Sequence, residues 1–426
     1  DPLTDLGNRR ALNADLSELV KEFPAETPIA FLHLDLDRFK FVNDLFGHAA
    51  GDHLLSAVAD ILRRTARHSD RLYRLGGDEF AVVISEGDVG ERASEVADWI
   101  VAACRQPVLY EDKELLFGCS VGICVGTLSE AASLIDNADI ALYVAKSAGR
   151  NQSALFTPEL RRQAEDKKRL ADSLTAAMAA DRITMRLQPQ IWAESRTLAG
   201  VEALARWHHE ELGELPPSYF LPVAEELGIL HEIDDIILMK TVAAVRRLAS
   251  KGLILPRVSV NASHRRILQP DLLDRIEAIG PMPCKLAFEL LETIDFDGLT
   301  DDMTARLQAI RSRGIEIEVD DFGSGRASIT TLLRVQPDRV KIDRQLVTAD
   351  ILSGRRAKSV LRAITEMAEA LDIPVTAEGV ETEEQAWRAT DLGCDILQGF
   401  LFSKPLTEAE LFEWAREQSI TAAAQG

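Results

Sequence analysis

The sequence has few cysteines, few basic residues and no long apolar run. Its five cysteines include no Cys-x-x-Cys pair, so neither a disulfide framework nor a zinc site is predicted, and a reducing compartment is expected. No apolar run approaches the ~20 residues of a membrane-spanning helix, and no signal peptide is visible. With 48 Lys and Arg against 69 Asp and Glu, the net charge of −21 argues against a long nucleic acid or an anionic membrane as a partner.

The chain is long enough for more than one domain. It has 426 residues, 46% of them apolar, with 16 Pro and 25 Gly. At ~100 to 200 residues per domain, this predicts two or three domains with sizeable cores and excludes disorder and collagen-like repeats. Because the sequence begins at Asp1 and not with Met, we expect a fragment with a sensory or membrane domain upstream. The expected location of this part is the cytoplasm.

The amino-terminal half has the pattern of an α/β domain with carboxylates at strand ends. The run IAFLHLDL (29–36) predicts a buried strand that ends near Asp35, and RLYRLGGDEFAVVI (71–84) predicts a hairpin with a Gly-Gly turn. Asp78 and Glu79 lie at the mouth of this hairpin. Neighbouring strands can bring the three carboxylates to one Mg²⁺. From spacing alone, solvated turn carboxylates are the better explanation.

The second half is built from a repeated unit. A polar helical stretch, residues 158–181, is expected to link a domain at 1–157 to one at 182–426. Beyond it, short apolar runs that end in polar residues alternate with helical stretches. The polar run ends are Glu202, Asn261, Glu289, Asp320 with Asp321, Lys341, Glu378 and Gln398. They are 59, 28, 31, 21, 37 and 20 residues apart, which predicts a (β/α)₈ barrel with room for one more unit in the first gap.

Polar residues at the carboxyl ends of barrel strands converge on one mouth, where TIM-type barrels carry out their chemistry. Gathering several carboxylates there with an amide and a single lysine would cost free energy unless further cations were present. The run ends therefore predict a metal site before any family is considered.

Three segments of the first half carry a family signature: LDLDRFKFVNDLFGHAAGD (34–52), RLGGDEF (74–80) and ADIALYVAKSAGRN (138–151). With the opening DPLTDLGNRR, they make residues 1–157 resemble a diguanylate cyclase, or GGDEF, domain, which implies a nucleotidyl-cyclase-like α/β sandwich. Domains of this family join two GTP molecules, each bound by one domain, into cyclic di-GMP. The resemblance therefore implies GTP as substrate or effector and a homodimer as the working form.

The resemblance also implies roles for individual residues. Asp35 and Asp78 would bind Mg²⁺ with assistance from Glu79. Asn43 and Asp52 would read guanine, since a carboxylate can accept its N1 and N2 hydrogens. Arg74, Lys146 and Arg150 match phosphate-contact positions, although each could equally be a surface cation. Arg67 and Asp70 match the inhibitory R-x-x-D site for product cyclic di-GMP, a pattern that also occurs easily by chance.

The second half carries GVEALARW, VNAS, DDFGSG, KID, AEGVE and QGF in order, and residues 182–415 resemble an EAL-family cyclic di-GMP phosphodiesterase. The resemblance implies that Glu202, Asn261, Glu289 and Asp320 hold one ion, Mg²⁺ or Mn²⁺. Asp320, Asp321 and Glu378 would hold a second, and the shared Asp320 implies a separation of roughly 3.5 to 4 Å. Such a pair suits hydrolysis of the phosphodiester to linear pGpG.

Further residues are assigned by the same resemblance. Lys341 would orient or activate the water, or it would balance charge with Asp343 as its partner. Glu292 would steady the DDFGSG loop (320–325). The positions implied to line the site or contact cyclic di-GMP are Gln188, Arg206, Asp343, Glu381 and Gln398. The chain departs from the common pattern at Leu187, Leu291 and Arg326, none of which is an implied metal ligand.

The combined expectation is a bifunctional enzyme that makes and degrades cyclic di-GMP. Hydrolysis is expected to dominate in this fragment, because the cyclase reaction needs two amino-terminal domains face to face whereas each barrel holds its own metal site. The alternatives are a phosphodiesterase whose first domain senses GTP, acting through residues 158–180, and a cyclic di-GMP receptor scaffold.

Overall fold

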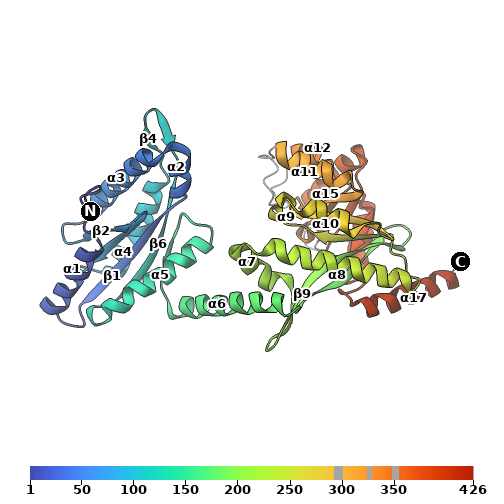
Figure 1. Cartoon of the computed structure of the whole chain (residues 1–426), viewed down its shortest axis with the longest axis horizontal. Helices are drawn as coiled ribbons and strands as arrows, with labels where there is room; N and C mark the ends of the chain where they lie inside the picture. Colours follow the sequence, from blue (N-terminus) through green and yellow to red (C-terminus); the bar gives the residue numbers. More distant parts are fainter. Residues whose placement is uncertain (292–300, 324–328, 348–354, 426) are drawn as a thin grey trace. The chain divides into compact units, whose positions relative to one another are not determined.

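The chain forms two compact units in a computed structural model that describes residues 1–291, 301–323, 329–347 and 355–425. The units are Asp1–Arg169 and Leu170–Gly426, and each contains helices and strands (Figure 1). None of the helices in the described ranges combines the length and the low charge that crossing a bilayer requires.

The first unit is built around a five-stranded sheet. Its elements are α1 (Arg9–Glu22), β1 (Pro28–Asp37), α2 (Phe39–Phe46), α3 (His48–Thr65), β2 (Arg71–Gly76), β3 (Glu79–Ile84), α4 (Val89–Cys104), β4 (Val108–Tyr110), β5 (Lys113–Leu115), β6 (Gly118–Thr127), a short 3₁₀ helix η1 (Leu128–Glu130), α5 (Ala131–Ser147) and β7 (Ser153–Leu155). The strand order is β2-β3-β1-β6-β7, with β4 and β5 as a separate hairpin.

Both faces of this sheet are covered by helices, which explains why β1 has an almost continuous apolar sequence. Ala30, Leu32 and Leu34 pack with α3 and α4 in one hydrophobic cluster. Ile29 and Phe31 pack with α1 and α5 in another. The predicted hairpin is present, because β2 pairs antiparallel with β3, and both glycines of its turn have positive φ (147° and 54°). The mixed α/β architecture predicted for this half is confirmed.

A single helix, α6 (Pro158–Ala179), follows β7. It contains the boundary between the two units, which falls at residues 169 and 170. Only Leu174 and Ala177 of this helix are buried, in keeping with its polar sequence. The helix coincides with the stretch predicted as a linker, and the linking role itself stays a prediction.

The second unit is a closed barrel with outer helices (Figure 1). Its elements are β8 (Ile183–Trp192), β9 (Leu198–His209), β10 (Gly213–Leu215), α7 (Pro217–Leu227), α8 (Leu230–Ser250), β11 (Arg257–Asn261), α9 (His264–Leu268), α10 (Leu272–Ile279), β12 (Lys285–Leu291), α11 (Asp301–Arg311), β13 (Ile315–Phe322), α12 (Ile329–Val335), β14 (Arg339–Ile342), α13 (Arg344–Val347), α15 (Arg355–Ala370), β15 (Val375–Ala377), α16 (Glu383–Asp391), β16 (Ile396–Gln398) and α17 (Glu408–Gln425).

Eight strands close the barrel in the order β9-β11-β12-β13-β14-β15-β16-β8, and β8 pairs back onto β9. The predicted (β/α)₈ architecture is confirmed. The position of one strand differs from the expectation. The gap between Glu202 and Asn261 holds α7, α8 and the short β10 instead of a further barrel strand. The remaining strand is β8, which precedes β9 and runs antiparallel to both of its neighbours.

Candidate active site

The carboxyl-terminal ends of the parallel strands supply most polar residues of the barrel mouth. Strand pairing brings them level: Asn261 is opposite Glu289, and Asp320 is opposite the last residue of β12. Lys341 lies near the end of β14, and Glu378 directly follows β15. Glu202 lies in the middle of β9, since the second half of that strand continues to pair with β8 and β10.

A bulge in β13 brings two successive carboxylates to the same place. Side chains at successive strand positions normally face opposite sides of a sheet. Here the register with β14 shifts between Val319 and Phe322, and Asp321 has a left-handed backbone with φ of 54°. Such a bulge redirects a side chain. Asp320 and Asp321 consequently approach Glu378, and ligand atoms of all three lie within 4.8 Å of one another.

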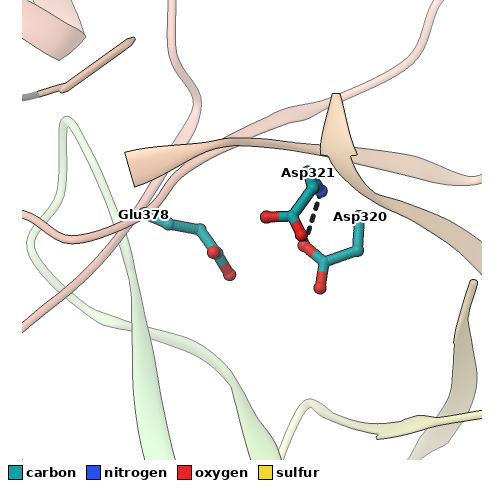
Figure 2. Close-up of side chains that lie close together, drawn as sticks. All are labelled: Asp320, Asp321 and Glu378. Carbon is teal, nitrogen blue, oxygen red and sulfur yellow. Dashed lines mark hydrogen bonds between the residues drawn. The ribbon is translucent and has the colours of Figure 1, made fainter. Parts of the chain in front are cut away.

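Figure 2 shows Asp320 and Asp321 side by side, with Glu378 facing them. Asp320 is steadied by the backbone N–H of Asp321, which donates to its Oδ1 at 2.9 Å. Glu378 approaches from the neighbouring segment after β15. An all-oxygen group of this kind suits hard divalent cations such as Mg²⁺ or Mn²⁺.

Lys341 lies among four carboxylates of this mouth. Its Nζ is 3.0 Å from Glu202, 3.1 Å from Glu289, 3.5 Å from Asp320 and 2.6 Å from Glu378. The lysine is fully buried. These contacts, and not a pair with Asp343, are the ones that the structure records for the charge of Lys341. The Asp343 carboxylate instead accepts a hydrogen bond from the N–H of Gln345 at 2.5 Å.

One lysine does not compensate these four carboxylates. Burial, followed by repulsion from Glu202, holds the pKa of Glu289 well above its ordinary value. Burial likewise raises the pKa of Asp320 and raises that of Glu378 to about 8. For Glu202, burial is outweighed by Lys341 and by hydrogen bonds from Gln398 and other neighbours, so its pKa is lowered. Lys341 therefore balances only part of the negative charge of these carboxylates, and bound divalent cations would balance the rest.

The mouth opens into a cavity of about 380 Å³. Seven of its lining residues were predicted from the sequence: Gln188, Glu202, Asn261, Asp320, Glu378, Glu381 and Gln398. The Arg206 guanidinium donates to the Ala205 carbonyl at 2.7 Å and lies 3.8 Å from Glu214, and its predicted contact with substrate stays a prediction. Glu292 lies outside the described residues, as does the end of the loop that it was predicted to steady.

In the first unit, strand pairing brings the predicted metal residues close together. Asp35 on β1 is opposite Glu79 on β3, and the N–H of Leu36 donates to the Asp78 carbonyl. Asp35 also forms an ion pair with Lys146 at 2.7 Å, and burial raises its pKa. The oxygens of the three carboxylates do not all come within 4.8 Å of one another. Their metal role stays a prediction.

The residues predicted to read guanine lie at the corner between α2 and α3. A Cβ added to Gly51 would lie 2.0 Å from the side-chain oxygen of Asn43, so Asn43 packs directly beside the residue that precedes Asp52. Among the predicted phosphate contacts, Arg74 donates to the Gly77 carbonyl at 2.8 Å and Arg150 lies 4.0 Å from Asp37.

The R-x-x-D segment forms a closed turn. The N–H of Arg67 donates to the Asp70 carboxylate at 2.7 Å, and Arg92 on α4 binds the same carboxylate at 3.1 Å. The side chain of Asp70 is only 2% exposed, whereas Arg67 is exposed. Of the predicted pair, Arg67 is thus the accessible member.

Known domain families match both parts of the chain. Residues 171–405 match the EAL domain family, and residues 1–152 match the diguanylate cyclase GGDEF domain family. The chain is a tandem GGDEF–EAL protein. The family resemblance predicted from the sequence is thereby confirmed.

Several curated relatives share this GGDEF–EAL arrangement over nearly the whole chain. Cyclic di-GMP phosphodiesterase NbdA of Pseudomonas aeruginosa is 31% identical over 99% of this chain and 54% of its own length. Cyclic di-GMP phosphodiesterase PdeR of Escherichia coli is 34% identical, with coverages of 97% and 63%. The bifunctional diguanylate cyclase/cyclic di-GMP phosphodiesterase MucR of P. aeruginosa is 32% identical, with coverages of 96% and 61%. The chain thus spans little more than half the length of these relatives.

Solved structures resemble the EAL domain and the tandem arrangement. The MucR phosphodiesterase in complex with cyclic di-GMP is 29% identical with a TM-score of 0.52, covering 57% of this chain and 99% of that one. LapD of Vibrio cholerae, an S helix-GGDEF-EAL protein bound to cyclic di-GMP, has a TM-score of 0.54 at 21% identity, with coverages of 94% and 95%. The LapD likeness concerns the fold alone.

Sequence reasoning missed one acidic residue of the EAL cavity. Asp234 on α8 lines the cavity, its carboxylate accepts the N–H of Ser263 at 2.9 Å, and burial raises its pKa to about 6. Phe400, which is 56% exposed, lines the same cavity. No sequence signal distinguishes Asp234, because it lies inside a helix and not at a strand end.

Proposed function

We propose that the EAL barrel hydrolyses cyclic di-GMP to linear pGpG with two bound divalent ions. The observation that carries the proposal is the meeting of Asp320, Asp321 and Glu378 within ligand distance, beside Glu202 and Lys341. The curated relatives named as cyclic di-GMP phosphodiesterases support the same reaction.

The donor set of the mouth fits Mg²⁺ or Mn²⁺, because it consists of carboxylate and amide oxygens with unneutralised charge. We propose that Glu202, Asn261, Glu289 and Asp320 hold one ion, and that Asp320, Asp321 and Glu378 hold the other. When bound, such ions supply a hydroxide at neutral pH and polarise a phosphoryl oxygen.

In this proposal the protein's own groups position the substrate and hold protons. Lys341 Nζ, with three donor hydrogens, orients the attacking water and offsets the carboxylate charge around it. Gln188, Gln398 and Glu381 line the cavity and contact the dinucleotide, as Asp343 and Arg206 would at the rim. Asp234 can accept the N1 and N2 hydrogens of one guanine, and Phe400 offers a ring on which a base can stack.

The test follows cyclic di-GMP and pGpG by chromatography with Mg²⁺ or Mn²⁺. We expect pGpG from the intact chain, none from the Glu202→Ala variant, and an undiminished rate from Asp78→Ala, which alters only the first unit. Persistence of pGpG formation in Glu202→Ala at the wild-type rate would refute the assignment of the site.

We further propose that the GGDEF domain binds GTP as substrate or effector. Asp35, Asp78 and Glu79 would hold Mg²⁺ on the triphosphate, Asn43 and Asp52 would bind guanine, and Arg74, Lys146 and Arg150 would contact phosphates. The placement of Asn43 beside Gly51 and the pairing of Asp35 with Glu79 support this. Condensation of two GTP would require a homodimer, and Arg67 with Asp70 would bind the product.

The proposed substrates lead to expectations about the location and the dominant activity of this part of the protein. Because GTP is a cytoplasmic metabolite, we propose that this part of the protein works in the cytoplasm. We also propose that hydrolysis is the dominant activity, since one barrel contains its whole site. Pyrophosphate release from GTP without loss of cyclic di-GMP would contradict that order, and binding of both nucleotides without turnover would favour a receptor.

A further inference from the structure

A line of hydrogen bonds crosses the closed interior of the barrel toward the mouth. The Arg339 guanidinium donates to Gln190 Oε1 at 2.9 Å, Gln190 Nε2 donates to Gln398 Oε1 at 2.9 Å, and Gln398 Nε2 donates to Glu202 Oε2 at 2.5 Å. All four side chains are buried, and Gln190 is 0% exposed. We call these four residues the glutamine relay.

The direction of the relay is set at Arg339. A guanidinium has donors only, whereas a glutamine amide has an acceptor end and a donor end. Gln190 must therefore turn its oxygen to Arg339 and its NH₂ to Gln398. Gln398 must then turn its oxygen to Gln190, which leaves its NH₂ for the Glu202 carboxylate and for Gln188 Oε1 at 3.2 Å.

An ion-pair group holds Arg339 at the opposite end of the barrel from the mouth. Arg339 is the first residue of β14 and lies 3.7 Å from the fully buried Glu318. Arg257, the first residue of β11, binds Glu318 at 2.7 Å and Glu316 at 2.6 Å. A guanidinium held between such partners is a fixed donor, since breaking a buried ion pair leaves an uncompensated charge.

We propose that Gln190 and Arg339 are positioning residues for the metal ligand Glu202, because they fix the orientation of the Gln398 amide that donates to it. The proposal rests on the assignment of Glu202 to a metal site under the proposed function. Without the relay, the Gln398 oxygen loses the donor that Gln190 supplies, and only the two acceptors of its NH₂, Glu202 and Gln188, still hold the amide. Replacing a group that hydrogen-bonds a metal ligand and so orients it typically lowers metal affinity or activity by about 10- to 100-fold.

Two substitutions at Gln190 separate this role from a merely structural one. Gln190→Met keeps the volume and removes both polar ends. Gln190→Glu keeps the contact with Arg339 and adds an ion pair, but its second oxygen attracts the NH₂ of Gln398 and so turns the Gln398 oxygen toward Glu202. A purely structural role makes Gln190→Glu the milder change, whereas the relay makes it the more severe one.

The measurement is Mn²⁺ affinity of the metal-stripped full chain by calorimetry, with kcat and KM for cyclic di-GMP alongside. We expect Mn²⁺ binding to weaken by about 10- to 100-fold in Gln190→Glu and by less in Gln190→Met. The kcat should fall in the same order with little change in KM. Glu202→Ala identifies the affected ion, and Thr241→Val, a buried polar-to-apolar change on α8, should leave Mn²⁺ affinity unchanged.

A second pair of variants keeps the test decisive if the Gln190 variants fold poorly. Arg339→Met removes the fixed donor and should weaken Mn²⁺ binding, while Arg339→Lys retains a donor and should weaken it less. Mn²⁺ affinity within about twofold of wild type in Gln190→Glu, or equal affinities in the two Arg339 variants, would overturn the relay.

The relay and the proposed function can fail separately. Wild-type hydrolysis with unchanged Mn²⁺ affinity in the variants refutes the relay alone. If the variants show the expected order of Mn²⁺ affinities but the wild-type chain forms no pGpG, the relay is supported and the hydrolysis is refuted.

Discussion

At the scale of single residues, charge balance in the barrel mouth depends on Lys341. Its ammonium contacts four carboxylates that come from four different segments of the barrel. In the absence of metal it is the cation that keeps Glu202, Glu289, Asp320 and Glu378 together. A divalent ion bound at this mouth would therefore share the structural role of Lys341.

Replacing Lys341 with Met should destabilise the metal-free barrel. Removing one partner from a buried ion group costs about 3 to 5 kcal/mol, and pGpG formation should fall at least about 100-fold. We expect a lower unfolding midpoint in EDTA, and Mn²⁺ should raise the midpoint of the variant more than that of the wild type. Differential scanning calorimetry measures both. Lys285→Met, which removes a largely exposed lysine paired with Glu316, is the control, and an equal midpoint for both variants in EDTA would contradict the prediction.

Asp234 should give the EAL cavity a pH-dependent stability. Its pKa rises from 3.8 to about 6 on folding, chiefly through burial, so the folded state binds this proton more tightly than the unfolded state. The favourable contribution is therefore complete below pH 4 and is lost as the pH rises to about 6. Above that value the ionised carboxylate lowers the free energy of unfolding by up to about 3 kcal/mol.

Asp234→Asn removes this cost, because the amide oxygen can still accept the N–H of Ser263. We expect the variant to melt higher than the wild type at pH 7.5, with the difference shrinking toward pH 4, and to bind cyclic di-GMP less tightly. Thermal melts across this pH range check the first expectation and calorimetry checks the second. Asp274→Asn, at an exposed position of α10, should show neither effect. A pH-independent difference would count against the titration of Asp234.

At the scale of elements, the corner between α2 and α3 depends on close packing at Gly51. Any side chain there would collide with Asn43, since a Cβ would lie 2.0 Å from its oxygen. The guanine-reading role proposed for Asn43 on α2 thus requires a glycine at position 51 of α3.

Gly51→Ala should weaken GTP binding by displacing the Asn43 side chain. A loss of roughly tenfold, about 1.4 kcal/mol, is expected in a titration with GTP and Mg²⁺, while hydrolysis by the barrel is unaffected. Gly90→Ala is a matched control, because its added Cβ would meet Asp88 at an ordinary 3.6 Å. Equal GTP affinity for the two variants would show that Asn43 does not read the base.

Elements also show where sequence reasoning succeeds and where it ends. The order of strand ends from Glu202 to Gln398 was predicted, because parallel strands followed by helices leave a regular polar and apolar pattern. The antiparallel direction of β8 was not, since an apolar run gives no direction to its strand. The Asp320–Asp321 bulge and the central position of Lys341 depend on pairing registers that no local pattern contains. The contact of Arg206 with Glu214 likewise depends on pairing across strands, and the substrate role that its family position implies stays a prediction.

At the scale of the whole molecule, we expect GTP in the GGDEF domain to change the rate of the EAL domain through α6. The rate of pGpG formation with and without GTP measures this coupling. Lys168→Pro should abolish the GTP effect, because proline inside a helix removes a hydrogen bond and bends it at a cost of about 3 kcal/mol. The rate without GTP should stay within about twofold of wild type. Lys168→Ala is the control, and a GTP effect that survives in Lys168→Pro would exclude α6 as the route.

The direction of β8 determines where the EAL barrel is attached to the rest of the chain. Ile183, the first residue of β8, is opposite Trp207, beyond Glu202 along β9. The polypeptide therefore enters the barrel at the rim of the mouth, whereas a parallel first strand would bring it in at the far end. Gln188, which lines the cavity, follows on the same strand. A pull or twist on the entering chain therefore acts at the mouth of the barrel. Only the segment of β8 from Ile183 to Gln188 separates it from the cavity.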